Sequence, residues 1–157
     1  MSAGTHIGLF YSRGRNGLQA LESLRGLEPD ARICFIVPAG YPLSEAECAI
    51  ADTVVKAERD TYSPADVRAC TRLLRTIRAA RFDRFVVLFP SVQLRMLGAL
   101  SGARACVCLS PRGNLRALER SAVWVLAKAA CAAIGGRLAY AALWLAVRLL
   151  PVPPGPD

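Results

Sequence analysis

The chain alternates short apolar runs with amphipathic stretches between residues 6 and 109. The apolar runs are typical of strands, and we predict strands at His6–Ser12, Arg32–Val37, Phe85–Phe89 and Ala105–Leu109, with a weaker one at Asp52–Ala57. Apolar residues at helical spacing predict helices at Leu18–Leu27, Ser44–Ala51 and Val92–Leu100, and a further helix that starts near Ser63. This order predicts an α/β layered domain over residues 1–115, with a mainly parallel sheet of about five strands.

Two of these helices begin with capping signals. Glu47 follows Ser44 by three residues, which predicts a capping box. Ser63 and Pro64 suit the N-cap and the first position of the next helix. In that helix we predict an apolar stripe at Val67, Cys70, Leu74 and Ile77. The arginines Arg68, Arg72 and Arg75 then face solvent, either as an anion-binding patch or as an ordinary solvated face.

Residues 116–150 form an apolar segment without proline, which we predict to be helical. A proline-rich end, residues 151–157, cannot continue a helix. In one continuous helix, Trp124 and Trp144 would lie about 30 Å apart, which is the thickness of a bilayer core. That spacing resembles the aromatic belts of membrane proteins and predicts that both tryptophans anchor the segment.

Charged residues within this segment leave its relation to the membrane open. Lys128, Arg137 and Arg148 interrupt it, so that no uncharged run reaches the length of a membrane span. A spanning helix, an interfacial helix, a hairpin bent at Gly135 and a pair of soluble helices packed on the domain are the alternatives. Arg116 and Arg120 precede the apolar core and would lie on the cytosolic side, next to anionic lipid.

The charge distribution indicates an anionic partner for the second half of the chain. The net charge is +8, and residues 84–157 carry nine basic and two acidic side chains. The basic residues near the apolar segment alternate with alanine and leucine rather than with aromatics, and no nucleic-acid-binding motif occurs. We therefore expect an anionic membrane surface as partner and no nucleic acid.

Cysteine usage, the N-terminus and the overall composition complete this picture. The six cysteines include no CxxC pair and the chain has one histidine, so we predict reduced thiols, no metal site and no cofactor. The N-terminus lacks a secretory signal pattern. Eighteen of the twenty basic residues are arginine, on an alanine-rich background that indicates a high-GC bacterial source. The expected location is the cytoplasmic face of a bacterial inner membrane.

Ligand contacts are expected in the loops after the strands, because open parallel sheets bind ligands beyond the carboxyl ends of their strands. The candidates in these loops are Arg13, Arg15, Asn16, Ser91, Gln93, Arg112 and Asn114. Two arginines beside a helix start would suit a phosphate, although the same loop also suits an ordinary turn. No set of nucleophile, base and orienting group is apparent, so no catalytic residue is predicted.

Two passages of the chain resemble heptosyltransferase-type glycosyltransferases. Leu18–Val37 looks like the first helix and second strand of that family, with its "PDARI" step. The pattern Phe82-Asp83-x-x-Val86, followed by Ser91, Arg95 and Ser101-Gly-Ala-Arg104, is similar to a later strand–helix passage. The resemblance covers about residues 6–115 and implies a Rossmann-like fold, corresponding to the N-terminal, acceptor-side half of a GT-B enzyme.

The chain also departs from that family in two ways. The nucleotide-sugar domain that would follow is replaced by the apolar segment, and Asn16 stands where the family places an aspartate. An amide cannot act as a carboxylate base. We therefore expect a membrane-associated glycosyltransferase-like half-domain in envelope glycan or glycolipid synthesis, non-catalytic alone, which acts as a partner subunit or acceptor-binding module. The alternatives are a membrane-tethered interaction module and a small α/β enzyme on a phosphorylated metabolite.

Overall fold

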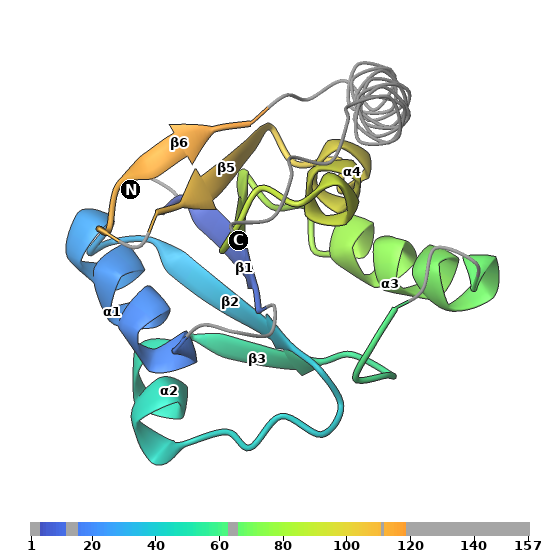
Figure 1. The fold of residues 1–157 in the computed structure, drawn as a ribbon. Coiled ribbons are helices and arrows are strands. Elements are labelled where there is room, and N and C mark those ends of the chain that lie inside the picture. Colours follow the sequence, from blue (N-terminus) through green and yellow to red (C-terminus); the bar gives the residue numbers. More distant parts are fainter. Residues whose placement is uncertain (1–3, 12–15, 63–65, 111, 119–157) are drawn as a thin grey trace, which may run out of the picture.

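The computed structural model describes residues 4–11, 16–62, 66–110 and 112–118 (Figure 1). Its strands are β1 (His6–Phe10), β2 (Arg32–Val37), β3 (Thr53–Lys56), β4 (Arg84–Val87), β5 (Ala105–Leu109) and β6 (Leu115–Ala117). Its helices are α1 (Gly17–Leu27), α2 (Glu45–Ile50), α3 (Val67–Ala79) and α4 (Val92–Leu100). The alternation of strands and helices predicted from the sequence is confirmed, with β2, α4 and β5 at the predicted bounds.

The strands form one mainly parallel sheet in the order β3-β2-β1-β4-β5-β6. The first five are parallel, and β6 pairs with β5 in the antiparallel direction. The α/β class is therefore confirmed, but the sheet has six strands rather than about five. Arg116 lies within β6 and pairs with Cys108, so it does not begin a helical segment as we predicted.

The chain changes direction across the sheet between β1 and β4. Strands β1, β2 and β3 follow one another towards one edge, and β4 then returns to the free side of β1. Helices α1 and α2 pack on one face of the sheet, whereas α3 and α4 pack on the other (Figure 1). The neighbouring strands β1 and β4 thus form a topological switch point, where open α/β sheets bind their ligands.

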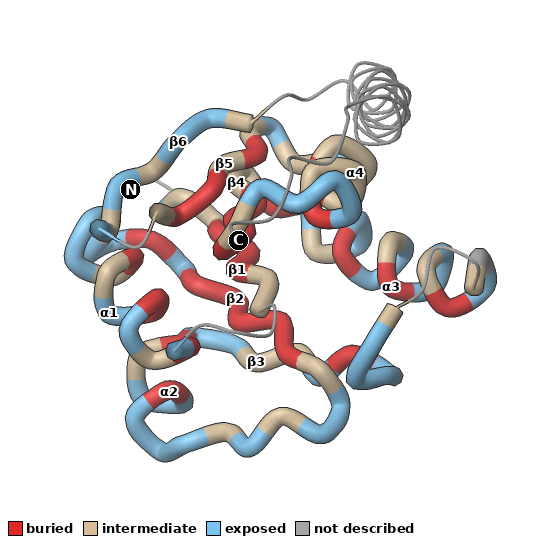
Figure 2. The backbone as a smooth tube through the Cα atoms, viewed as in Figure 1, coloured by how far each residue is buried: buried red, intermediate tan, exposed pale blue. Residues whose placement is uncertain are grey.

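Two apolar clusters hold the helix layers to the sheet. In β2, Ile33, Phe35 and Val37 belong to the cluster under α1 and α2, whereas Cys34 and Ile36 belong to the cluster under α3 and α4. This assignment follows the two-residue period of a strand. Figure 2 shows the buried residues concentrated in the central strands. A strand covered on both faces explains the unbroken apolar runs in the sequence.

The buried stripe of α3 differs from the one predicted. Ala69, Leu73 and Ile77 are buried. Of the predicted set, Ile77 is buried, Cys70 and Leu74 are half-buried, and the Val67 side chain lies outside the described part of the structure. Asp66 is the N-cap of α3, with its side chain accepting a hydrogen bond from the Ala69 amide at 3.1 Å. The predicted cap Ser63 lies outside the described residues. Leu73 and Ile77 are the α3 side chains that belong to the apolar cluster under α3 and α4, so the contact with the sheet uses a stripe one residue earlier than the predicted Leu74.

From residue 119 on, the predicted apolar segment lies beyond the described part of the chain, which ends at Leu118. The anchoring residues predicted there, Arg120, Trp124 and Trp144, are therefore not placed. Among the helices that the structure describes, none has the length and apolar composition needed to cross a bilayer.

Candidate ligand-binding edge

Two of the predicted ligand residues begin helices at the switch point. Asn16 is the N-cap of α1, and its side-chain oxygen accepts a hydrogen bond from the Leu18 amide at 3.1 Å. Ser91 is the N-cap of α4 and accepts from the Leu94 amide at 3.2 Å. Because β1 and β4 are neighbours and their helices pack on opposite faces, the amino ends of both helices meet this edge of the sheet. Such helix ends favour negative charge.

An aromatic cluster lies beside the start of α1. The rings of Tyr11 and Tyr41 have centroids 4.4 Å apart, and both are half-buried. Phe35 meets each of them edge-on, at 6.2 Å from Tyr11 and 6.0 Å from Tyr41. Tyr11 follows β1 and Tyr41 follows β2, so the cluster joins two loops at the carboxyl edge. We did not predict these residues, although aromatics just after two adjacent strands were a usable signal.

A buried carboxylate forms a hydrogen bond with this cluster. Glu47 is only 3% exposed, and the Tyr41 hydroxyl donates to its Oε1 at 2.6 Å. The Ser44 amide and hydroxyl donate to Oε2 at 2.9 and 3.0 Å. The predicted capping box of α2 is thus confirmed. Its carboxylate also accepts the hydrogen bond from Tyr41, which the local sequence did not indicate. Buried charges persist where hydrogen bonds compensate them in this way.

The packing at this point requires a glycine at the start of α1. A Cβ at Gly17 would lie 2.5 Å from the Tyr41 hydroxyl oxygen and 2.6 Å from Glu47 Oε1. Any larger residue would displace one of these partners. The start of α1, the tyrosine hydroxyl and the carboxylate therefore form one interlocked unit.

Burial and the neighbouring carboxylate change the acidity of the tyrosine. Desolvation, followed by the hydrogen bond to Glu47, raises the pKa of Tyr41 above its usual value. The hydroxyl therefore stays protonated at neutral pH and acts as a hydrogen-bond donor. A phenol held in this state positions groups and does not serve as a base.

The other carboxylates at this edge also have structural partners. Asp60 Oδ1 accepts from the Gly40 amide at 2.5 Å, which fixes the loop after β2. Asp66 caps α3 and forms an ion pair with Arg59. Because these oxygens hold loops and helix starts in place, the edge resembles a binding surface more than an acid–base centre.

The remaining predicted contacts lie apart from the aromatic cluster. Arg112 and Asn114 are exposed in the β5–β6 turn, where the Asn114 amide donates to Ser110 Oγ at 3.1 Å. Gly113 has a φ of +81°, and a Cβ there would lie 3.9 Å from Ser23, in the middle of α1. This turn therefore borders α1 rather than the switch point.

Three further candidates remain to be placed. Gln93 is exposed in the first turn of α4, close in sequence to Ser91. Arg13 and Arg15 lie outside the described residues. Asn16, Ser91 and Gln93 of the predicted set therefore follow the neighbouring strands β1 and β4, and the aromatic cluster follows β1 and β2.

At the amino ends of β2 and β3, one arginine connects several elements. Arg25 at the end of α1 donates to the carbonyl oxygens of Ala31 and Ile50 at 2.7 and 2.8 Å, and pairs with Asp52 at 2.9 Å. Asp52 also accepts from the Ile33 amide at 2.7 Å. This backbone hydrogen bond, with the arginine as a further cause, lowers the pKa of Asp52. The contacts tie α1, β2 and the start of β3 together and are structural.

The cysteines divide into buried and exposed thiols. Burial raises the pKa of the Cys34 and Cys106 thiols to about 11, whereas Cys48 is exposed on α2. The described residues include no group of three or more acidic, histidine or cysteine side chains placed to hold a metal ion.

Comparison with known proteins does not assign this chain to a family. No family model matches it, and neither does any curated protein sequence. The resemblance to heptosyltransferase-type enzymes therefore stays a prediction that rests on the passages quoted above.

Proposed function

We propose that this chain is a membrane-associated, glycosyltransferase-like half-domain that holds a sugar- or phosphate-bearing ligand at the carboxyl edge of its sheet. In this proposal it works with a catalytic partner subunit in bacterial envelope glycan or glycolipid synthesis. It is not a complete enzyme alone. Its place is the cytoplasmic face of the inner membrane.

The observation that carries this proposal is the aromatic cluster beyond the carboxyl ends of β1 and β2. Ligand sites combine aromatic walls with a few oriented polar groups, and here Tyr11 and Tyr41 lie beside the amino end of α1. Aromatic rings offer an apolar face to a sugar or a base, and helix amino ends accept a phosphate. The two kinds of contact together fit a glycosyl phosphate or a nucleotide sugar better than an apolar ligand.

The carboxylates favour binding over catalysis. Glycosyl transfer needs a free base or nucleophile near the acceptor. Here Glu47 caps α2 and accepts from Tyr41, and Asp60 fixes the loop after β2. Asn16, at the position where the resembled family has an aspartate, caps α1 with its amide oxygen. Because these groups already hold helices and loops in place, they support a subunit that binds the ligand while a partner subunit catalyses the transfer.

The test is a titration of the isotope-labelled full chain in lipid nanodiscs, followed by NMR, with a nucleotide sugar, a sugar phosphate and inorganic phosphate. We expect the amide signals of Gly17, Tyr41 and Ser91 to shift with a sugar-bearing ligand. Tyr11→Leu should weaken binding by about 5- to 150-fold, corresponding to the loss of one stacking ring. Tyr62→Leu, on the other face of the sheet, is the matched control and should bind normally.

Three results would contradict the proposal. Shifts confined to the opposite face would place the ligand elsewhere. Equal shifts with inorganic phosphate alone would favour a small enzyme on a phosphorylated metabolite. Sugar transfer by the purified chain, detected by mass spectrometry of the acceptor, would show that it needs no catalytic partner.

A further inference from the structure

The two helix layers of the domain differ in charge. Helices α3 and α4 carry five arginines and no acidic residue, whereas α1 and α2 carry three glutamates and one arginine. Because the two layers cover opposite faces of the sheet, one helical layer is strongly basic and the other is not, and of the three glutamates Glu47 is buried. The charge separation follows from the sheet topology and is not visible in the net charge.

Three arginines on α3 form what we call the arginine row, namely Arg68, Arg72 and Arg75. All three are exposed, and their spacing of four and three residues places them on one side of the helix. Thr71 lies among them and is also exposed. The row therefore presents a continuous positive surface to the surroundings of the domain.

The arginine row is weakly compensated within the domain. Arg72 Nε lies 3.2 Å from Glu58 Oε2, with both side chains more than half exposed. Such an exposed pair contributes little and is screened by salt. Arg68 and Arg75 form no ion pair with a carboxylate of the described residues. Their charges are thus available to an anionic partner.

The last described residue, Leu118, contacts the same helix layer that carries the arginine row. Leu118 packs against the apolar cluster beneath α3 and α4, and its amide donates to the Cys106 carbonyl at 2.8 Å. Residues 119–150, which make up most of the predicted apolar segment, follow Leu118 in the sequence. The last described residue before them thus has its side chain in the apolar cluster that also underlies the most basic helix layer.

We propose that the arginine row binds the phosphate groups of anionic phospholipids, so that the domain lies with α3 against the membrane surface. Guanidinium groups form paired hydrogen bonds with phosphate, and each basic residue near an anionic surface adds to its attraction. An apolar segment that follows Leu118 in the sequence favours a lipid surface over a nucleic acid, which would need exposed aromatics or base-reading contacts. This inference rests on the membrane association in the proposed function.

The first experiment measures partitioning of the full chain onto vesicles of phosphatidylcholine, with and without phosphatidylglycerol. The variant Arg68→Gln/Arg75→Gln should bind the anionic vesicles about 30-fold more weakly than the unchanged chain. Arg68→Lys/Arg75→Lys should retain most of the affinity. Both variants should keep the melting temperature of the unchanged chain, because the replaced side chains are exposed.

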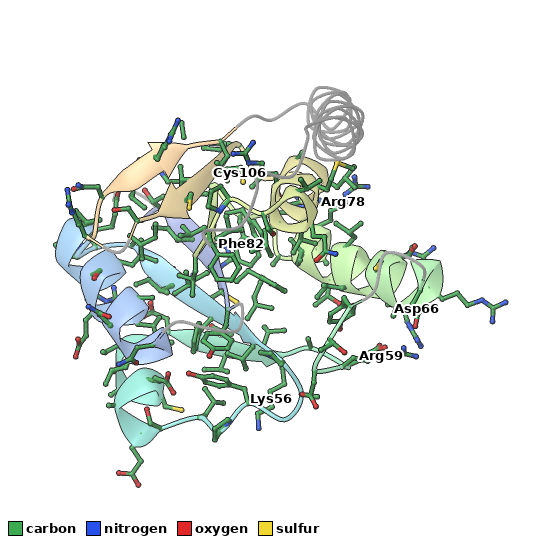
Figure 3. All side chains as sticks on the ribbon, in the orientation of Figure 1. Lys56, Arg59, Asp66, Arg78, Phe82 and Cys106 are labelled. Carbon is green, nitrogen blue, oxygen red and sulfur yellow. The ribbon has the colours of Figure 1, made fainter. Side chains whose placement is uncertain are left out.

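A matched control removes the same charge from another part of the surface. Arg32 and Lys56 are exposed and carry no ion pair among the described residues. Figure 3 shows Lys56 beside β3, away from the α3 helix. Arg32→Gln/Lys56→Gln should therefore leave partitioning within about twofold of the unchanged chain, since charges far from the surface are screened.

The outcomes separate this inference from the proposed function. No binding of the unchanged chain to either vesicle would contradict membrane association itself. Binding that the arginine-row variant leaves unchanged, or that both double variants weaken equally, would overturn the arginine row as the contact while membrane association stands. Preferential binding of a single-stranded oligonucleotide, lost in the same variant, would overturn the lipid in favour of a nucleic acid.

A second measurement keeps the test decisive if the apolar segment dominates partitioning. An environment-sensitive fluorescent amino acid is placed at position 71, between Arg68 and Arg75, or at the exposed position 49 on α2. With anionic vesicles, emission at position 71 should shift to the blue and emission at position 49 should not. The reverse pattern, or equal shifts, would overturn the proposed orientation.

Discussion

Replacing Tyr41 with phenylalanine tests whether the tyrosine and the buried carboxylate form one unit. The change removes the donor that lies 2.6 Å from Glu47 Oε1 but keeps the ring against Tyr11 and Phe35. Glu47 is 3% exposed, so water cannot readily replace the lost donor. A hydrogen bond to a charged group contributes about 1.5–3 kcal/mol, so we expect Tyr41→Phe to lower the free energy of unfolding by about 2 kcal/mol.

Urea unfolding of the full chain, followed by far-ultraviolet circular dichroism, measures this change. With a slope of about 1.5 kcal/mol per molar urea, the midpoint should fall by about 1.3 M, while the slope itself stays constant. Tyr62→Phe is the matched control, because Tyr62 packs on the other cluster and its hydroxyl bonds to no described residue. A loss below about 0.5 kcal/mol in Tyr41→Phe would refute the reasoning, since surface changes have that size.

The same variant should also remove part of the alkaline unfolding. The folded state raises the pKa of Tyr41 above its unfolded value near 10. Below about pH 10 the hydroxyl is protonated in both states and contributes no pH dependence. Above it the unfolded chain releases the proton first, so stability falls as the pH rises. Tyr41→Phe should show a shallower fall between pH 10 and 12, and an unchanged slope would contradict the assignment.

Three further changes test the core and the amino ends of β2 and β3. A Cβ at Gly98 would lie 2.1 Å from Cys106 Sγ, so Gly98→Ala should lower the free energy of unfolding in urea by about 1–3 kcal/mol. Gly26 has open space around it, so Gly26→Ala is the control and should leave the free energy of unfolding unchanged or raise it by up to about 1 kcal/mol. The pKa of Asp52 is lower in the folded state, so its carboxylate stabilises the fold above the unfolded pKa, and this stability is lost as the pH falls through the folded pKa. In Asp52→Asn the free energy of unfolding should therefore decrease less steeply with falling pH below about pH 4. A decrease as steep as in the unchanged chain would contradict this. With its pKa raised to about 11, the Cys106 thiol should resist alkylation at pH 8 in the folded chain while Cys48 reacts, as mapped by mass spectrometry; equal rates would contradict the burial.

The helices and strands were largely predictable because their signals are local. The capping box of Ser44 and Glu47 is complete within four residues, and the strand Ala105–Leu109 is bounded by turn residues on both sides. β6 was missed because Leu115–Ala117 is only three residues long and two of them are exposed. Its strand conformation depends on pairing with the edge of β5, which no local pattern encodes.

The candidate site was predictable only in outline. Parallel-sheet geometry selected the loops that carry Asn16 and Ser91, and both begin helices at the switch point. The aromatic cluster was missed because Tyr11 and Tyr41 are thirty residues apart and meet only when β1 and β2 pair. Likewise, the capping role of Glu47 is written in the adjacent sequence, but its bond to Tyr41 depends on how the loop after β2 folds back.

The reversal of the chain in β6 determines where Leu118 lies relative to the switch point. β6 runs from the carboxyl edge back along β5, so Leu118 lies beside Cys106 near the start of that strand. A strand of the five residues of β5 is about 17 Å long. The point of attachment therefore lies at one end of the strands and the switch point at the other. In the proposed membrane-bound arrangement, a chain held through the residues after Leu118 therefore keeps the carboxyl ends of β1 and β4 at the far end of the strands from its point of attachment.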